Sequence, residues 1–314
     1  MPGELRYDPL TDDWVNIVGH RQRRPNLPSD GCPFCVGGLE APEPYDVRWF
    51  TNRWPAYAPG PIVDLDAART GGIERVDAIG TTEVVLFSPD HTASLASMPC
   101  DHVRKVVDLW ADRTEALLSR DEIEYVLVFE NHGIEVGATI AHPHGQIYAY
   151  GFVPPEPRRE SDAARRAGHC PVCAETDREL HDASRIVAAN DTWVAYVPFA
   201  ATHSYGLRIA ARSHVASFVA LDDEQRDGLA SILGDVLGRY ERLWAAEPTP
   251  SFPYLLWFHQ APKHHDGEYH LHAHTAPPLR APGLPRFVAS GELGGGTLSN
   301  PVEPEAAAAA LRDA

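Results

Sequence analysis

Two histidines and a glutamine alternate in the run His142-Pro143-His144-Gly145-Gln146, the segment of this sequence best suited to chemistry. Alternate side chains of a strand point to the same face, so these three polar groups are predicted to lie side by side. An imidazole can attack an electrophilic phosphorus when a hydrogen bond to its other ring nitrogen fixes the tautomer. We therefore predict that His144 is a nucleophile toward a phosphate group and that Gln146 donates to a phosphate oxygen.

Paired cysteines and distant histidines form two candidate metal sites. Four of the five cysteines fall in two Cys-x-x-Cys pairs, and in a chain of 314 residues this pattern favours metal over disulfides. Thiolates together with imidazoles suit tetrahedral zinc. The first predicted zinc set is Cys32, Cys35, His91 and His142, and the second is Cys170, Cys173, His214 and His270. The alternative interpretation is that the cysteines are small buried side chains and the histidines are ordinary core residues.

The two zinc sets occupy equivalent places in an internal duplication. In each half the second cysteine of the pair is followed 17 positions later by an asparagine, Asn52 or Asn190. A strand-like apolar run then leads to the first histidine of the set, and an amphipathic helical pattern, a second apolar run and a histidine-rich strand follow. This repeat predicts an α+β fold of two related halves, each an antiparallel sheet crossed by a helix. The predicted halves span residues 1–155 and 156–314.

A third cluster of histidines lies in the second half. His270, His272 and His274 alternate along the histidine-rich strand, so their side chains are expected to share one face. Together with His259 and a carboxylate, this face either binds a metal or faces solvent. The residues alone leave both interpretations open.

Charge and hydropathy limit the partners. The formal net charge of −17 argues against a nucleic-acid backbone as partner. Against this acidic background, His20-Arg21-Gln22-Arg23-Arg24 is a local basic cluster, either a solvated turn or a site for a small phosphorylated ligand. No apolar run reaches the roughly 18 residues of a membrane span, and the polar start of the chain predicts a cytoplasmic protein.

From Glu130-Asn131-His132-Gly133 to His142-Pro143-His144-Gly145-Gln146, the sequence resembles the galactose-1-phosphate uridylyltransferase family, which belongs to the histidine-triad superfamily. The likeness covers most of the chain and includes residues 7–14, 50–52, 88–91 and 270–280. It implies two histidine-triad-like halves and an obligate homodimer. It also implies ping-pong transfer of UMP from UDP-glucose to galactose 1-phosphate through a uridylyl-histidine at His144, a step of galactose metabolism (the Leloir pathway).

The same resemblance implies roles for further residues. Nucleotide- and phosphate-binding positions fall on Arg21, Arg24, Asn52, Asn131, Thr139 and Gln146, and Glu292 matches a ligand of the sugar hydroxyls. The first zinc set is implied for the family, and the second matches a second zinc of related nucleoside-diphosphate-hexose phosphorylases. Some members carry iron on a carboxylate and three histidines, which here are Glu160, His259, His272 and His274, a site for iron or zinc.

Departures from the family pattern bear on the substrate. Arg53 stands where well-known members have an aspartate, and Gly291 and Leu298 replace a tyrosine and a glutamine that contact the sugar. They leave open a phosphorylase that releases hexose 1-phosphate from ADP- or UDP-glucose with inorganic phosphate. A non-catalytic, zinc-stabilised nucleotide-binding module is another alternative, against which the intact His144-Gly145-Gln146 argues. A hydrolase is disfavoured because Gln146 replaces the last histidine of the triad motif.

Overall fold

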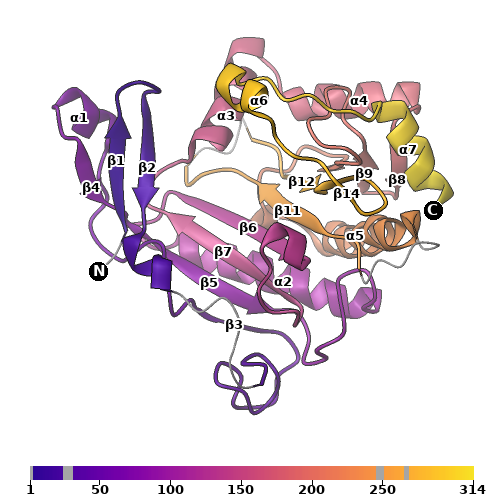
Figure 1. Cartoon of the computed structure of the whole chain (residues 1–314), viewed down its shortest axis with the longest axis horizontal. Coiled ribbons are helices and arrows are strands. Elements are labelled where there is room, and N and C mark those ends of the chain that lie inside the picture. Colours follow the sequence, from indigo (N-terminus) through magenta and orange to yellow (C-terminus); the bar gives the residue numbers. More distant parts are fainter. Residues whose placement is uncertain (1–2, 24–30, 245–250, 265–268) are drawn as a thin grey trace.

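A nine-stranded antiparallel sheet forms the centre of the part of the chain that the computed structural model describes, residues 3–23, 31–244, 251–264 and 269–314 (Figure 1). From one edge to the other the strands are β3 (Arg48–Thr51), β5 (Gly80–Leu86), β7 (His144–Tyr150), β6 (Tyr125–His132), β11 (Tyr254–His259), β12 (His272–Ala276), β10 (Arg208–Ala211), β9 (Trp193–Tyr196) and β8 (Ile186–Ala189). Strands from both ends of the chain therefore share one sheet.

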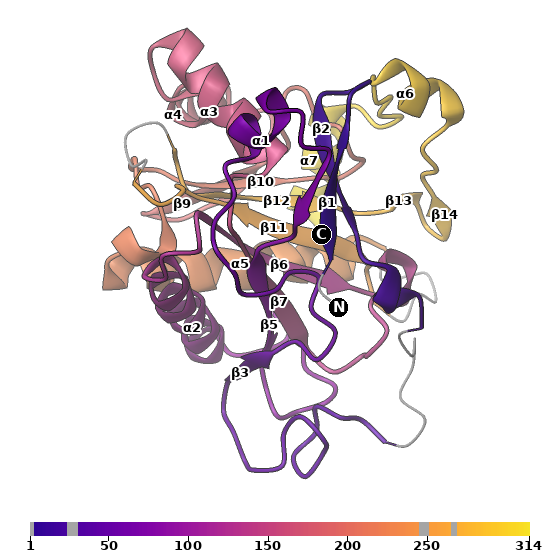
Figure 2. The ribbon, with the colours of Figure 1, turned by 90° about the vertical axis from the view of Figure 1, so that its left-hand side faces the viewer.

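The order of the strands shows the internal duplication. In the first half β3, β5, β7 and β6 lie side by side, and in the second half β9, β10, β12 and β11 repeat this order from the opposite edge. The halves join where β6 pairs with β11, with Phe129 opposite Trp257. Helices α2 (Cys100–Leu118) and α5 (Asp223–Leu243) pack together on one face of the sheet (Figure 2). The predicted α+β fold of two related halves is confirmed, whereas the boundary between residues 155 and 156 stays a prediction.

The two helices form because their apolar side chains recur at helical spacing. In α2, Val103, Val106 and Trp110 are buried and lie on the stripe that faces the sheet. α5 begins with a capping box in which the Asp222 carboxylate accepts from the backbone N–H of Gln225 at 2.8 Å. The helices thus cover one face of the sheet, and, among the described residues, three smaller apolar clusters and a number of polar residues share the opposite face.

Strand β7 shows how the alternation of residues separates these faces. Ile147 and Ala149 are fully buried beneath the helices. His144, Gln146 and Tyr148 are only half-buried and point to the opposite face. The strand therefore presents the predicted nucleophile away from the hydrophobic core.

The face opposite α2 and α5 carries most of the smaller elements (Figure 2). A three-stranded sheet there has the order β2 (Asp13–Ile17), β1 (Glu4–Asp8) and β4 (Arg75–Asp77). The helices on this side are α1 (Leu65–Thr70), α3 (Pro155–Ala167), α4 (Pro171–Asp182) and α6 (Ser290–Gly295). The remaining elements are α7 (Pro304–Asp313), which packs on α5 and β8, the pair β13 (Leu279–Ala281) and β14 (Leu284–Pro285), and the 3-10 turns η1 (Gly19–Arg23), η2 (Ile134–Val136) and η3 (Phe218–Ala220). None of the helices in the described ranges combines the length and apolarity needed to cross a bilayer.

Candidate active site and metal centres

His144 is the first residue of β7, and its ring is held in one tautomer. Its Nδ1 lies 2.8 Å from the carbonyl oxygen of His142. A carbonyl oxygen only accepts, so Nδ1 carries the proton and the neutral ring has its lone pair on Nε2. The ring of Phe34 packs against His144 with centroids 5.1 Å apart, and Phe34 lies between the cysteines of the first pair. This is the protonation pattern that a nucleophilic imidazole requires.

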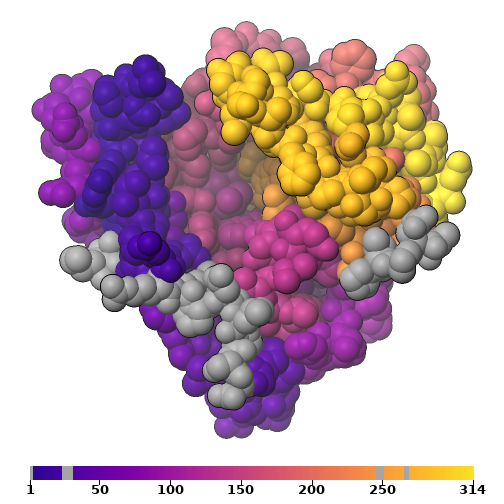
Figure 3. Space-filling model, viewed as in Figure 1, coloured from indigo at the N-terminus to yellow at the C-terminus, as the bar shows by residue number. Residues whose placement is uncertain are grey.

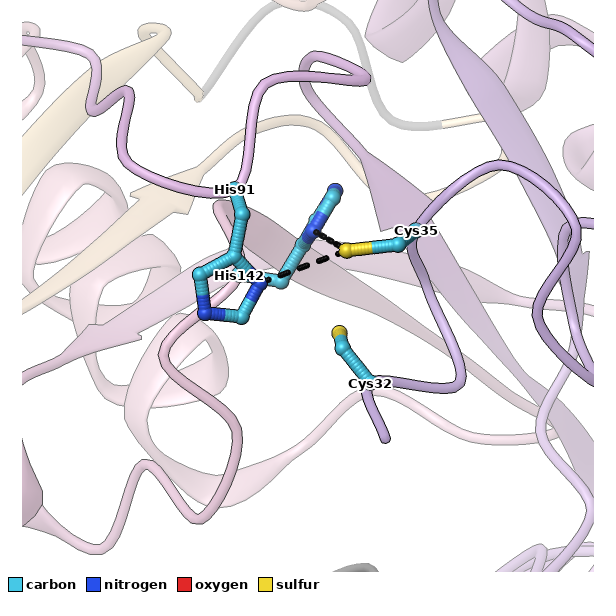
Figure 4. A group of neighbouring side chains, drawn as sticks. All are labelled: Cys32, Cys35, His91 and His142. Carbon is cyan, nitrogen blue, oxygen red and sulfur yellow. Dashed lines mark hydrogen bonds between the residues drawn. The ribbon is translucent and has the colours of Figure 1, made fainter. Parts of the chain in front are cut away.

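The four side chains of the first predicted zinc set, Cys32, Cys35, His91 and His142, converge on one point (Figure 4). The Sγ of Cys35 lies 3.4 Å from Nδ1 of His91 and 3.6 Å from Nδ1 of His142. Tetrahedral zinc with bonds of about 2.3 Å to sulfur and 2.0 Å to nitrogen holds such ligands about 3.5 Å apart. The other ring nitrogen of His142 donates to the carbonyl oxygen of Ser88 at 2.8 Å, an outer contact typical of zinc-bound histidines. Burial lowers the pKa of His142, which favours the neutral ring that a metal needs.

The second set has the same arrangement at the start of α4. The Sγ of Cys173 lies 3.5 Å from Nδ1 of His214 and 3.3 Å from Nδ1 of His270. The Sγ of Cys170 lies 3.6 Å from the same nitrogen of His270. Burial, with the neighbouring His272 and His214, lowers the pKa of His270 to about 4. Burial and the Cys170 thiol raise the pKa of Cys173 to about 12, so its thiolate form needs a cation.

The third cluster joins α3 to the sheet. Glu160 Oε1 lies 2.8 Å from Nδ1 of His259, 3.6 Å from Nε2 of His272 and 3.8 Å from Nε2 of His274. Burial alone would raise the pKa of Glu160, but the adjacent His272 and His259 outweigh it and hold the pKa far below its usual range. The buried Nε2 of His274 has no hydrogen-bond partner among the described residues. One carboxylate and three imidazoles that converge in this way fit iron or zinc.

The duplication extends to the hydrogen bonds of these sites. In the second half, Nδ1 of His272 donates to the carbonyl oxygen of His270 at 2.6 Å, as His144 does to His142. His270 in turn donates to a backbone carbonyl oxygen at 2.9 Å, matching His142 at 2.8 Å. The difference is that Nε2 of His272 faces Glu160. Equivalent strand positions therefore hold a candidate nucleophile in one half and a candidate metal ligand in the other.

A cavity of about 1070 Å³ lies next to His144. It reaches from the first zinc set, past the loop between β6 and β7, to the end of α5. Among the predicted substrate-binding residues, Asn131 and Thr139 line it. Sequence reasoning missed its lining residues in the second half, Gly238, Glu241, Arg242 and Ser251, because only the tertiary packing of α5 and of the segment before β11 brings them to this cavity.

Gln146 lies on the face of β7 that carries His144, and Arg21 contacts Tyr148 on the same face. The buried Oε1 of Gln146 has no hydrogen-bond partner within the described ranges. Nη1 of Arg21 donates to the hydroxyl of Tyr148 at 3.3 Å, and Tyr148 is two residues beyond Gln146 on the same face. Tyr148 is thus a neighbour of the site that the sequence reasoning did not identify. The predicted phosphate ligand Arg24 lies outside the described residues.

The other predicted substrate residues are engaged within the chain. Asn52 is buried, and its Oδ1 accepts from the backbone N–H of Trp54 at 2.9 Å. Glu292 accepts from Arg286 at 2.8 Å and caps α6 through the backbone N–H of Ala289. Glu292 does not line the cavity beside His144.

The three departures from the family pattern have different surroundings. Arg53 forms an ion pair with Glu40 at 2.9 Å. Leu298 lines a separate cavity of about 490 Å³, which Glu160, His259 and His274 of the third cluster also line. Gly291 has open space where a side chain would begin.

Comparisons with known proteins match both halves of the chain. The model of the galactose-1-phosphate uridyl transferase N-terminal domain matches residues 38–154, and that of the C-terminal domain matches residues 160–313. The galactose-1-phosphate uridylyltransferase of Thermotoga maritima is 37% identical over 318 residues, covering 99% of this chain and 98% of that protein.

Two solved structures share the whole architecture. A uridylyltransferase is 29% identical with a TM-score of 0.86, and the match covers 99% of this chain and 97% of the other. An ADP-glucose phosphorylase from Arabidopsis thaliana, solved with bound ADP-glucose, is 25% identical with a TM-score of 0.74 and covers 99% of each chain.

Proposed function

The chain belongs to the galactose-1-phosphate uridylyltransferase family and is a uridylyltransferase; on that premise we propose that it moves UMP from UDP-glucose to galactose 1-phosphate by way of His144. The observation that carries this proposal is the hydrogen bond of His144 Nδ1 to the His142 carbonyl oxygen, which puts the lone pair on Nε2. The cavity beside this ring offers room for a nucleotide sugar.

The reaction consists of two displacements at the α-phosphorus. In the first, Nε2 of His144 forms a bond to phosphorus, the bond to the bridging oxygen breaks, and glucose 1-phosphate leaves. In the second, a phosphate oxygen of galactose 1-phosphate attacks, the phosphorus–nitrogen bond breaks, and UDP-galactose leaves. His144 recovers its lone pair, so the cycle is balanced.

The neighbouring polar residues stabilise charge on the phosphate. An amide N–H of Gln146 donates to a non-bridging oxygen, since this side chain follows His144 on the same face of β7. Arg21, held near that face by Tyr148, supplies positive charge, and Arg24 is proposed to act with it. Asn131 and Thr139 bind phosphate oxygens from the cavity wall.

The metal sets are proposed to be structural. Bound zinc would lock the first set and so fix the backbone of His142, whose carbonyl oxygen orients His144. The second set suits another zinc, and the third suits iron or zinc. Both zinc sets need reduced thiols, which supports the proposed cytoplasmic location, and cell fractionation would test it.

Glu292 is proposed to act in a homodimer. Its segment exposes Phe287, at 81%, and Leu293, at 74%, although neither side chain has an evident role in the isolated chain. Burial of these side chains against a second copy would bring the segment to the partner, where Glu292 could accept from sugar hydroxyls. This arrangement accounts for its absence from the cavity of its own chain.

A phosphorylase is the second candidate because Gly291 and Leu298 remove two sugar-contacting side chains and because the fold matches an ADP-glucose phosphorylase. The decisive experiment is a panel of donors and acceptors under one set of conditions. We expect UDP-glucose to react faster than ADP-glucose as the donor, and galactose 1-phosphate to react faster than inorganic phosphate as the acceptor. We also expect weak discrimination between glucose and galactose. Faster turnover with ADP-glucose or with phosphate would establish the phosphorylase instead.

A further inference from the structure

His132 lies in a cluster of charged and polar groups that the proposed chemistry leaves without a role. It is the last residue of β6 and lines the same cavity as His144. Its Nε2 lies 2.8 Å from the hydroxyl of Ser251, and its Nδ1 lies 3.6 Å from the carboxylate of Glu130. Its ring stacks on Tyr254 of β11, with centroids 4.8 Å apart. The side chain is only 20% exposed.

The donors and acceptors around His132 determine how many protons its ring carries. The single hydroxyl proton of Ser251 is donated to Oε1 of Glu241 at 2.8 Å. Ser251 must therefore accept from His132, so Nε2 carries a proton. Nδ1 faces the Glu130 carboxylate, which is 3% exposed and which a bare lone pair would repel. Both nitrogens are protonated in this arrangement, and Ser251 is not poised as a nucleophile because its proton points away from His132.

Groups from every neighbouring element bear on this charge. Glu130 belongs to β6, Glu241 to α5 and Glu135 to η2, while Tyr254 and Ser251 contribute a ring and a hydroxyl. Arg242 also lines the cavity, and its Nε donates to the carbonyl oxygen of Ala314. Burial would lower the pKa of His132, but the three carboxylates outweigh it and raise the pKa above the ordinary 6.5.

The cluster joins three segments at the base of the loop that carries Asn131 and Thr139. Besides Ser251, Glu241 accepts from the backbone N–H of Phe252 at 3.3 Å. Gly133, directly after His132, has φ +99 and packs so closely on Pro253 that a Cβ would lie 2.8 Å from the proline side chain. The end of β6, the end of α5 and the approach to β11 thus meet at His132.

We propose that His132, as an imidazolium, is a positioning residue that holds the loop from Asn131 to Thr139 in the geometry that binds the phosphates of UDP-glucose. The inference rests on the proposed function, because it assigns the loop to the nucleotide sugar. His132 is charged below its pKa and loses the charge as pH rises through that raised value. Tight binding of UDP-glucose is therefore complete at and below about pH 6.5 and is lost above the raised pKa.

The test compares the wild type and two His132 variants in the single-turnover half-reaction with UDP-glucose across pH. In this reaction KM denotes the UDP-glucose concentration that gives half of the maximal rate of glucose 1-phosphate release, and kcat denotes that maximal rate constant. UDP-glucose is suitable because it has no phosphomonoester, whose second pKa near 6 would overlap with histidine. His132→Gln removes the charge, and we expect KM to rise about tenfold or more at pH 6.5, with kcat changed far less. His132→Lys keeps a cation with an ordinary pKa of about 10.4, so low KM should persist to higher pH than in the wild type.

The matched control is His181→Gln, which removes an exposed histidine on α4 and should leave KM unchanged. Melting temperatures separate loss of fold from loss of positioning, and the lysine variant remains informative if the glutamine variant does not fold. Equal KM values for wild type and His132→Gln, or the same alkaline rise in wild type and His132→Lys, would overturn the inference. Failure of the wild type to release glucose 1-phosphate at all would instead overturn the proposed function.

Discussion

At the scale of single residues, the function depends on which nitrogen of a histidine carries the proton. His144 and His272 both donate Nδ1–H to the carbonyl oxygen two residues earlier. On the metal-ligand side, Nε2 of His272 faces the carboxylate of Glu160 at 3.6 Å. Equivalent positions of a duplicated backbone thus hold the proposed nucleophile in one half and a proposed metal ligand in the other.

Gln146 gives a prediction at this scale. Gln146→Ala should lower kcat about a hundredfold or more, because one donor to the developing charge on phosphate is lost. KM and the melting temperature should change little, since the Gln146 Oε1 makes no hydrogen bond within the described part of the chain. Steady-state kinetics and thermal melts measure both quantities. An unchanged kcat would exclude Gln146 from the reaction.

Residue types and spacing predict most of this site, but not all of it. The two sets of cysteine and histidine ligands come together as the repeat indicates. The place of Glu160 in the third cluster is predicted only from the family resemblance. It is 99 positions from His259, and no local sequence pattern predicts where α3 packs on the sheet. His132 and its partners are beyond sequence reasoning for the same reason, since Glu241 and Ser251 approach it through tertiary contacts.

At the scale of elements, the metal sets connect segments that secondary structure alone leaves apart. The first ties the loop around Cys32 to the start of β7, and the second ties the start of α4 to β12. Glu160 anchors α3 to the same strand. The third cluster therefore connects α3 to the sheet, and the second zinc set connects α4 to it.

Metal removal tests this arrangement. Cys32→Ser and Cys170→Ser should each lower the zinc content by about one equivalent per chain and lower Tm by about 5 °C or more, because metal-binding energy is folding energy here. Cys100→Ser is the control, since Cys100 is exposed and belongs to none of the three clusters. Metal analysis and calorimetry supply the two readouts. Zinc content that is unaffected by Cys32→Ser rejects the first site.

The helices and strands themselves follow closely from the sequence. The amphipathic pattern and apolar runs predict α2, α5 and their flanking strands because period and burial agree. The joining of the two halves into one continuous sheet, by contrast, could not be predicted from the sequence. Pairing of Phe129 with Trp257 joins two halves far apart in the chain, and strand register across such a distance is set by packing rather than by any local signal.

At the scale of the whole molecule, one surface has apolar side chains without cover. The segment around α6 crosses the exterior (Figure 3) and exposes Leu284, Phe287 and Leu293. Exposure of apolar side chains to water is unfavourable, and large exposed apolar patches mark interaction surfaces. These side chains support the proposed homodimer, in which the segment contacts a second copy.

The dimer prediction is specific. Light scattering should give the wild type twice the chain mass of 34.5 kDa, and Phe287→Asp should shift the protein toward the single-chain mass by placing a charge in an apolar contact. Val219→Asp introduces the same charge at an exposed position of η3, on the side of α2 and α5, and should remain dimeric. A wild-type mass of one chain contradicts the prediction.

The central claim is that UMP becomes covalently attached to His144. The most direct measurement is intact-mass and peptide mass spectrometry of the protein after incubation with UDP-glucose and no acceptor. We predict one acid-labile uridylyl group per chain, located on His144, with one equivalent of glucose 1-phosphate released and no adduct on His144→Ala. The same adduct on His144→Ala, or turnover by the wild type with no adduct on His144, would contradict the account.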